Sequence, residues 1–149
     1  MPAIVRWPGV IKPGSFTGEL AATYDIFTTM LTMANVPLPP GRIIDGTDLT
    51  PILLGTGPSQ HECLFQYHSG ANGPATVRCG NYKLHFDTTH RLYNLIADPH
   101  EDRPLDPAAD PALQAIMDKI TAARTAHLAT VVRNPHLTSS SPHHHLILT

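Results

Sequence analysis

The chain has 149 residues, of which 42% are apolar, and a formal net charge of -2. This size and composition suit one ordinary globular core, and the near-neutral charge gives no electrostatic case for binding nucleic acid or an anionic membrane. No apolar run approaches the roughly 18 residues that a membrane-spanning helix needs, so we expect none. The 15 prolines and 10 glycines predict short elements joined by many turns.

The N-terminal segment predicts a strand followed by a helix. Residues Ala3–Trp7 are typical of a short buried strand that ends at a Pro-Gly pair, and we expect Trp7 to anchor packing against a later sheet. Thr23 or Asp25 stands near the start of the helix. The helix is predicted because apolar residues recur at helical spacing and form one stripe: Ile26, Phe27, Met30, Leu31 and Ala34.

The proline-rich segment Val36–Pro40 ends this helix, and an extended loop over residues 41–60 follows, with one helical turn around Thr50–Leu54. Asp45 and Asp48 in this loop could be interpreted as paired carboxylates for acid–base catalysis. Their Asp-Gly-Thr-Asp sequence favours a turn instead, in which aspartate accepts hydrogen bonds from nearby backbone N–H groups.

Three strand candidates come next: Cys63–His68, Thr76–Phe86 and Arg91–Leu95. The Ser-Gly-Ala-Asn-Gly-Pro sequence between the first two predicts an antiparallel hairpin. If its register sets Tyr67 opposite Ala75, then Phe65 faces Val77 and Cys63 faces Cys79. A disulfide across the hairpin is then geometrically conceivable.

A second helix is predicted from Pro111 to about Val131, after a polar, proline-punctuated linker. Proline suits the first helical turn, and Asp110 can cap it. Residues 133–149 are rich in Ser, Pro and His, which predicts a disordered tail. The buried face of the helix is expected to consist of Leu113, Ile116, Met117, Ile120, Ala123 and Leu128.

Six short motifs, in order over roughly residues 1–105, resemble the region that follows the active-site core in type I sulfatases of the arylsulfatase A, steroid sulfatase and galactosamine-6-sulfatase kind. Any one motif alone would be weak, but the ordered set at family spacing is specific. The motifs are PAIVRWPGVIKPG at 2–14, Asp25–Met30, Ile43–Gly55, Glu62–Tyr67, Val77–Phe86, and Leu92–Leu95 with Asp98–Glu101.

The resemblance implies an α/β fold, which becomes α+β in an isolated fragment. Residues 1–60 would supply the terminal strand, helix and loop of the large, alkaline-phosphatase-like sulfatase domain. Residues 61–132 would form a small antiparallel sheet with a packed C-terminal helix, and residues 133–149 the tail. Such sulfatases carry no cysteine pair at Cys63 and Cys79, so we expect two free, partly buried thiols.

A sulfatase of this kind uses calcium and a formylglycine made from the cysteine of a C-x-P-S-R type motif. Neither that motif nor the calcium-ligand set is found in this sequence. Carried over position by position, no catalytic residue, metal ligand or cofactor site of the family falls in the chain. We therefore expect the C-terminal part of an arylsulfatase-like sulfuric ester hydrolase that completes the fold and substrate rim and is inactive alone. The alternative is a non-catalytic binding or regulatory module derived from a sulfatase tail, which could associate with a full-length sulfatase.

His68 and His90 are the candidates for a substrate rim, because they stand at the ends of the small sheet, where loops of such sulfatases shape substrate access. Lys83 and His85 should share one strand face, since side chains alternate. A zinc site built from the histidines would make an independent metal-dependent hydrolase. It is not favoured because few of them have paired ligand spacing, and His143–His145 is interpreted as an ordinary terminal tract.

The resemblance further implies a sulfated small molecule or glycan as ligand of the full-length enzyme. It also implies a lysosomal or extracellular location, although the chain carries no signal sequence of its own. Without the large sheet, the stripe of the first helix should be exposed as an apolar patch of a few hundred Å². We expect marginal stability or association as the consequence.

Overall fold

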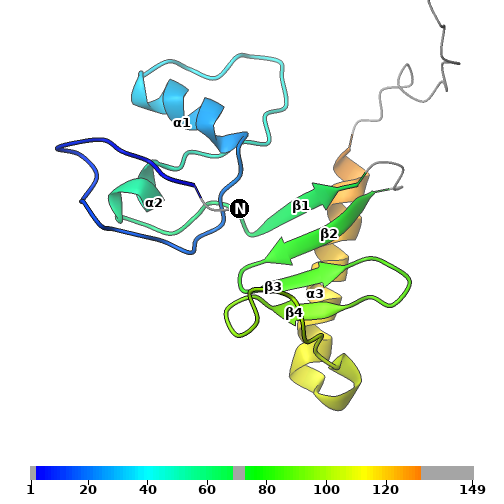
Figure 1. Cartoon of the computed structure of the whole chain (residues 1–149). Coiled ribbons are helices and arrows are strands. Elements are labelled where there is room, and N and C mark those ends of the chain that lie inside the picture. The colour runs from blue at the N-terminus through cyan, green and yellow to red at the C-terminus, as the bar shows by residue number, and fades with distance from the viewer. Residues whose placement is uncertain (1–2, 69–72, 132–149) are drawn as a thin grey trace, which may run out of the picture.

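The structure, a computed structural model, describes residues 3–68 and 73–131 and consists of two parts that follow each other along the chain (Figure 1). Residues 3–60, here called the N-terminal lobe, carry helices α1 (Asp25–Met33) and α2 (Thr50–Leu54) among long loops. The second part carries a four-stranded sheet, a short 3-10 helix η1 (Pro107–Ala109) and helix α3 (Pro111–Thr130). Among the helices of the described residues, none has the length and apolar character to cross a membrane.

The sheet is an antiparallel meander in the order β1-β2-β3-β4. Its strands are β1 (Cys63–Tyr67), β2 (Pro74–Cys79), β3 (Tyr82–His85) and β4 (Leu92–Asn94). The prediction of a single strand over Thr76–Phe86 is wrong, because the chain reverses at Gly80 and Asn81 and forms the two strands β2 and β3. Gly80 has φ of 54°, a left-handed conformation that glycine adopts without steric cost and that suits a two-residue hairpin turn.

The predicted register of the first hairpin is confirmed at two of its three pairs. Cys63 lies opposite Cys79 and Phe65 opposite Val77. Tyr67 pairs with Pro74 instead of Ala75, because β2 contains one extra residue at a bulge between Gln66 and Tyr67 of the partner strand. The extra residue belongs to β2, so β1 itself stays regular.

The core lies between one face of the sheet and α3, which runs behind the strands in Figure 1. Its fully buried side chains come from three strands and the helix: Val77, Leu84, Leu92 and Ile120. Leu113, Ile116 and Met117 of α3 pack against them, as the helical periodicity predicts. The sheet and the helix therefore form a core of their own, to which the N-terminal lobe contributes none of these residues.

Asp110 caps α3 as predicted. Its carboxylate accepts a hydrogen bond from the backbone N–H of Ala112 at 2.8 Å. We expect Asp110→Ala to lower the free energy of unfolding by about 1 kcal/mol, because that N–H loses its acceptor. Asp118→Ala, an exposed carboxylate in the middle of the same helix, is the control and should change stability by less than about 0.5 kcal/mol. Urea unfolding followed by circular dichroism measures both; equal effects would contradict a capping role.

The predicted strand at Ala3–Trp7 is absent. These residues have no regular structure, because no described segment offers them a partner strand for backbone hydrogen bonds. Trp7 is 42% exposed, so it does not anchor packing against the sheet. A strand pattern in the sequence needs a neighbour before it becomes a strand.

Helix α1 turns its polar side inward and its apolar stripe outward. Asp25, Thr28 and Thr29 are buried, whereas Ile26 and Phe27 are half exposed and Met30 is 61% exposed. The stripe is therefore not part of the core of this chain, and the prediction of an exposed apolar patch on this helix is confirmed.

The two cysteines are bonded to each other, which corrects the expectation of free thiols. Cys63 and Cys79 lie directly opposite each other in the hairpin, with their Cα atoms 4.1 Å apart. This separation is typical of an antiparallel pair that exchanges no backbone hydrogen bonds, where the side chains are closest. The disulfide joins the edge strand to the rest of the sheet.

Candidate functional site

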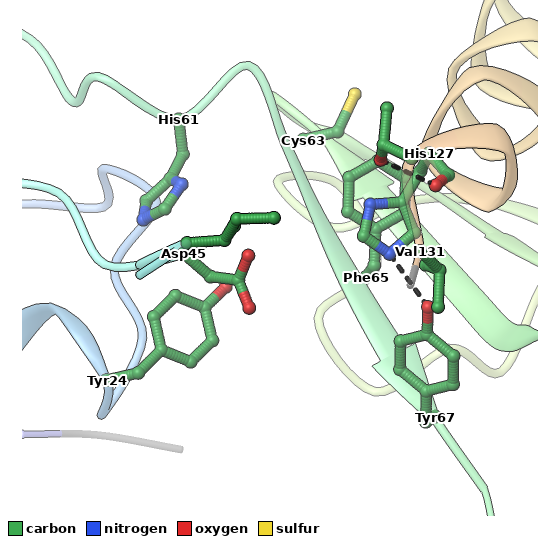
Figure 2. A pocket seen from close by; sticks show the side chains of 10 residues that line it. Tyr24, Asp45, His61, Cys63, Phe65, Tyr67, His127 and Val131 are labelled. Atoms are coloured by element: carbon green, nitrogen blue, oxygen red, sulfur yellow. Dashed lines mark hydrogen bonds between the residues drawn. The ribbon is translucent and has the colours of Figure 1, made fainter. Parts of the chain in front are cut away.

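An open depression of about 600 Å³ lies between the N-terminal lobe and the edge of the sheet (Figure 2). In Figure 2 the lobe side chains Tyr24, Asp45 and His61 face Phe65 and Tyr67 of β1 across this space. The end of α3 completes the wall on the sheet side, and the remaining lining residues are Ile43, Cys63, His127, Thr130 and Val131. Half of the lining residues carry aromatic or imidazole rings.

A buried carboxylate fixes the lobe wall. Asp25 is fully buried, and its Oδ1 accepts hydrogen bonds from the Thr47 backbone N–H at 2.8 Å and from His61 Nε2 at 2.7 Å. Its Oδ2 accepts a third from the Ala22 backbone N–H at 2.6 Å. One side chain thus joins the start of α1, the loop before α2 and the segment that enters the sheet. Asp25 and His61 are 36 residues apart, so no local sequence pattern indicates this pairing.

Tyr24 and the two loop aspartates complete this wall. Partial burial raises the pKa of the Tyr24 hydroxyl, and the negative charges of Asp25 and Asp45 raise it further, so Tyr24 stays a neutral hydrogen-bond donor. Asp48 accepts hydrogen bonds from the backbone N–H and the hydroxyl of Thr50, which confirms the predicted turn for that residue. Asp45 is exposed and lines the depression.

The sheet wall is a stack of rings. The His127 imidazole lies parallel to the Phe65 ring, with centroids 3.9 Å apart, and its Nε2 lies 2.8 Å from the Tyr67 hydroxyl. Cys63 is held in the disulfide, so it offers no free thiolate. Stacking on Phe65 and the contact with Tyr67 fix the position of the His127 ring on this side of the depression.

The sheet face opposite α3 carries a charged cluster. Lys83 Nζ lies 2.7 Å from Glu101, whose other carboxylate oxygen accepts a hydrogen bond from His85 Nε2. The predicted sharing of one face by Lys83 and His85 is therefore confirmed. Partial burial alone would raise the pKa of Glu101, but the hydrogen bonds from Lys83 and His85 outweigh it and hold the pKa below its usual range.

Glu101→Gln should lower stability at neutral pH by about 1–2 kcal/mol, because it removes the charge that Lys83 and His85 face. Since folding lowers the pKa of Glu101, its contribution is complete above the unfolded value, close to 4.5, and is lost as the pH falls through the lower folded value. Urea unfolding from pH 7 to pH 3 should show the two proteins converging in acid. Asp102→Asn, an exposed neighbour, should stay parallel to the wild type; a constant deficit for Glu101→Gln would contradict this account.

The candidate rim residues His68 and His90 lie outside the depression. Both are exposed, at the end of the sheet where β1 and β3 finish, and the structure brings neither into contact with the other. His90 has φ of 48°, and its ring meets the edge of Phe86 at a centroid distance of 5.8 Å. Over residues 3–68 and 73–131 no group of three or more His, Cys, Asp or Glu could hold a metal ion. The His143–His145 tract and the predicted tail lie outside the described residues.

The family described as "N-sulphoglucosamine sulphohydrolase, C-terminal" matches residues 1–128. The match covers most of the chain, and the chain belongs to this family of sulfatase C-terminal domains.

Two sulfatases illustrate the relationship in sequence. Steryl-sulfatase of Rattus norvegicus is 34% identical, over 95% of this chain and 30% of the relative. Arylsulfatase A of Homo sapiens is 43% identical, over 72% of this chain and 20% of the relative. The chain therefore spans less than a third of the length of these relatives.

Solved structures agree on the fold. The PsFucS1 sulfatase from Pseudoalteromonas sp. superimposes with a TM-score of 0.72 at 25% identity, over 83% of this chain and 28% of that one. A second structure, described as a complex with its substrate D-glucosamine-2-N,6-O-disulfate, gives a TM-score of 0.61 at 23% identity, over 85% of this chain and 27% of that one. The chain has the fold of the C-terminal end of alkaline-phosphatase-like sulfatases, as the sequence motifs predict.

Proposed function

We propose that this chain is the C-terminal part of an arylsulfatase-like sulfuric ester hydrolase, where it completes the fold and the substrate rim, and that it has no sulfatase activity alone. The observation that carries the proposal is the match of residues 1–128 to the sulfatase C-terminal family, together with the short share of its relatives that it spans. In this proposal the residues of the chain complete the fold and do not supply the catalytic groups.

The residues present do not fit the groups that the family uses for catalysis. The chain has two cysteines, and both are held in the disulfide Cys63–Cys79, so neither is available for conversion to formylglycine. Among residues 3–68 and 73–131, no group of three or more His, Cys, Asp or Glu could hold a metal ion. A nucleophile and a metal would have to come from polypeptide outside these residues.

The exposed stripe of α1 supports the role of completing a larger domain. Ile26, Phe27 and Met30 form an apolar surface of the kind that marks an interaction site, and in the complete enzyme the large domain would cover it. His68 and His90 would then stand on loops at the substrate rim. The ligand class is a sulfated small molecule or glycan, in keeping with the sulfated glucosamine bound to one structural neighbour.

The disulfide also bears on location. Disulfides persist in oxidising compartments and are rare in the cytosol. The bonded pair Cys63–Cys79 therefore supports a lysosomal or extracellular enzyme.

An activity assay tests the proposal. The purified chain, shown to be folded by circular dichroism, is incubated with calcium and an aryl sulfate such as 4-nitrophenyl sulfate. We expect no release of nitrophenol above the protein-free blank. Turnover that rises with protein concentration and co-purifies with the chain would overturn the proposal. The variant His90→Ala serves to locate any such activity, since it alters an exposed rim candidate that is not one of the buried core residues.

A further inference from the structure

Strand β1 has a free edge with unpaired backbone groups. It is the outer strand of the sheet, and among the described residues it pairs only with β2 (Figure 1). Its outer edge borders the depression, with the lobe side chains Tyr24, Asp45 and His61 across that space. The short Cα distance of 4.1 Å between Cys63 and Cys79 marks a pair that exchanges no backbone hydrogen bonds, so the N–H and C=O of Cys63 point away from β2. The alternation along the strand gives Phe65 the same orientation. No described backbone group outside the sheet bonds to either residue.

This edge lacks the features that normally prevent strands from pairing with other chains. β1 reads Cys-Leu-Phe-Gln-Tyr and contains no charge, proline or glycine, and the bulge of the hairpin lies in β2. The opposite edge differs, because β4 has three residues and Leu105 bridges to it at Leu92. The two edges are therefore not equivalent, and only β1 offers a regular strand to a partner.

We propose that β1 pairs antiparallel with β1 of a second copy of this chain, about a twofold axis at Phe65, to give one continuous eight-stranded sheet. In this register Phe65 forms a hydrogen-bonded pair with the partner's Phe65. The pair uses the backbone N–H and C=O of Phe65, which point away from β2. Leu64 lies opposite the partner's Gln66, so no like charges meet along the strand. The proposal rests on this edge and on the side chains at its two ends, one of which, His68, is also a candidate for the proposed substrate rim.

The polar side chains of Glu62 and His68, at the two ends of β1, favour the same register. With the axis at Phe65, Glu62 lies opposite the partner's His68, and symmetry produces this pairing of acid with imidazole twice. Both residues are exposed, and they lie on the same face as Leu64 and Gln66, so they are free to meet across the interface. A shift of the axis by one residue to either side separates Glu62 from the partner's His68. His68 thus gains a role at a subunit interface.

Sedimentation equilibrium over a hundredfold range of concentration tests the proposal. We expect the wild-type chain to form dimers. His68→Glu should weaken dimerisation about tenfold or more, because it sets two pairs of carboxylates against each other. The double variant Glu62→Lys/His68→Glu sets a lysine opposite a carboxylate in the same register and should recover the wild-type dissociation constant. All these positions are exposed, so the variants should fold.

A matched control separates this interface from the apolar stripe of α1. Met30→Lys interrupts the stripe and should leave the dissociation constant unchanged. Hydrogen exchange gives a local reading: the Phe65 amide should exchange more slowly as dimer forms, and Gln66→Lys should abolish that slowing by charging the edge. Gln66→Lys also removes the hydrogen bond that the Thr76 hydroxyl donates to Gln66 Oε1. Thr76→Val removes that bond without charging β1 and should retain the slowing.

Three results would overturn the proposal. The wild type could remain monomeric throughout the range, the double variant could fail to recover dimerisation, or Met30→Lys could abolish association that His68→Glu leaves intact. The last result would assign association to α1 instead.

Discussion

Asp25→Ala is expected to unfold the N-terminal lobe while the sheet and α3 stay folded. The substitution leaves the backbone N–H groups of Ala22 and Thr47 without their carboxylate acceptor, and leaves His61 Nε2 with the Thr47 hydroxyl as its partner. Removing one partner from a buried charged network costs roughly 3–5 kcal/mol. Leu20 is the one buried apolar side chain among the described lobe residues, so the lobe has little other packing to offset this loss. The sheet has its own core and does not depend on Asp25.

Native-state hydrogen exchange measures this prediction residue by residue. Amides of residues 20–60 should lose protection in Asp25→Ala, while those of the sheet and α3 keep theirs. Asp45→Ala removes an exposed carboxylate from the same lobe and should change protection by less than about 0.5 kcal/mol. Unchanged lobe protection in Asp25→Ala would mean that the network is not what holds the lobe together.

Elements defined by local patterns could be predicted from the sequence. The period of α3 and its cap at Asp110 are both local, and they fixed that helix to within one residue at its end. The hairpin register followed from a turn signal and alternation over a few residues. Resemblance to sulfatases then identified the fold class, because the motifs cover most of the same elements.

Features that depend on distant partners could not be predicted. Ala3–Trp7 has the residue pattern of a strand, but a strand forms only when a neighbouring strand supplies partners for its backbone hydrogen bonds. The turn at Gly80 and Asn81 was missed because strand-forming residues continue on both sides of it. The wall of the depression depends on Asp25 and His61, which meet only in the folded lobe. No spacing rule connects residues that far apart.

The disulfide is expected to contribute about 3 kcal/mol to stability, because it closes a loop of about 16 residues in the unfolded chain. Loss of the disulfide should affect the local stability of β1 more than that of the other strands. This strand is an edge, held to the sheet on one side only, and Cys63 sits at its start, next to the segment that enters from the lobe. Without the bond, the amides of β1 should lose protection before those of β3 or α3.

Urea unfolding at one fixed protein concentration, with and without a reducing agent, measures this contribution. The wild type should lose about 3 kcal/mol on reduction, whereas the double variant Cys63→Ala/Cys79→Ala should match the reduced protein and ignore the reducing agent. Replacing both residues together matters, because a single substitution would leave one unpaired thiol able to link two chains. An unchanged free energy of unfolding on reduction would contradict this prediction. It would mean that the unfolded chain keeps the ends of this loop close together even without the disulfide. The bond would then act on the geometry of the depression, which Cys63 lines, rather than on the stability of the fold.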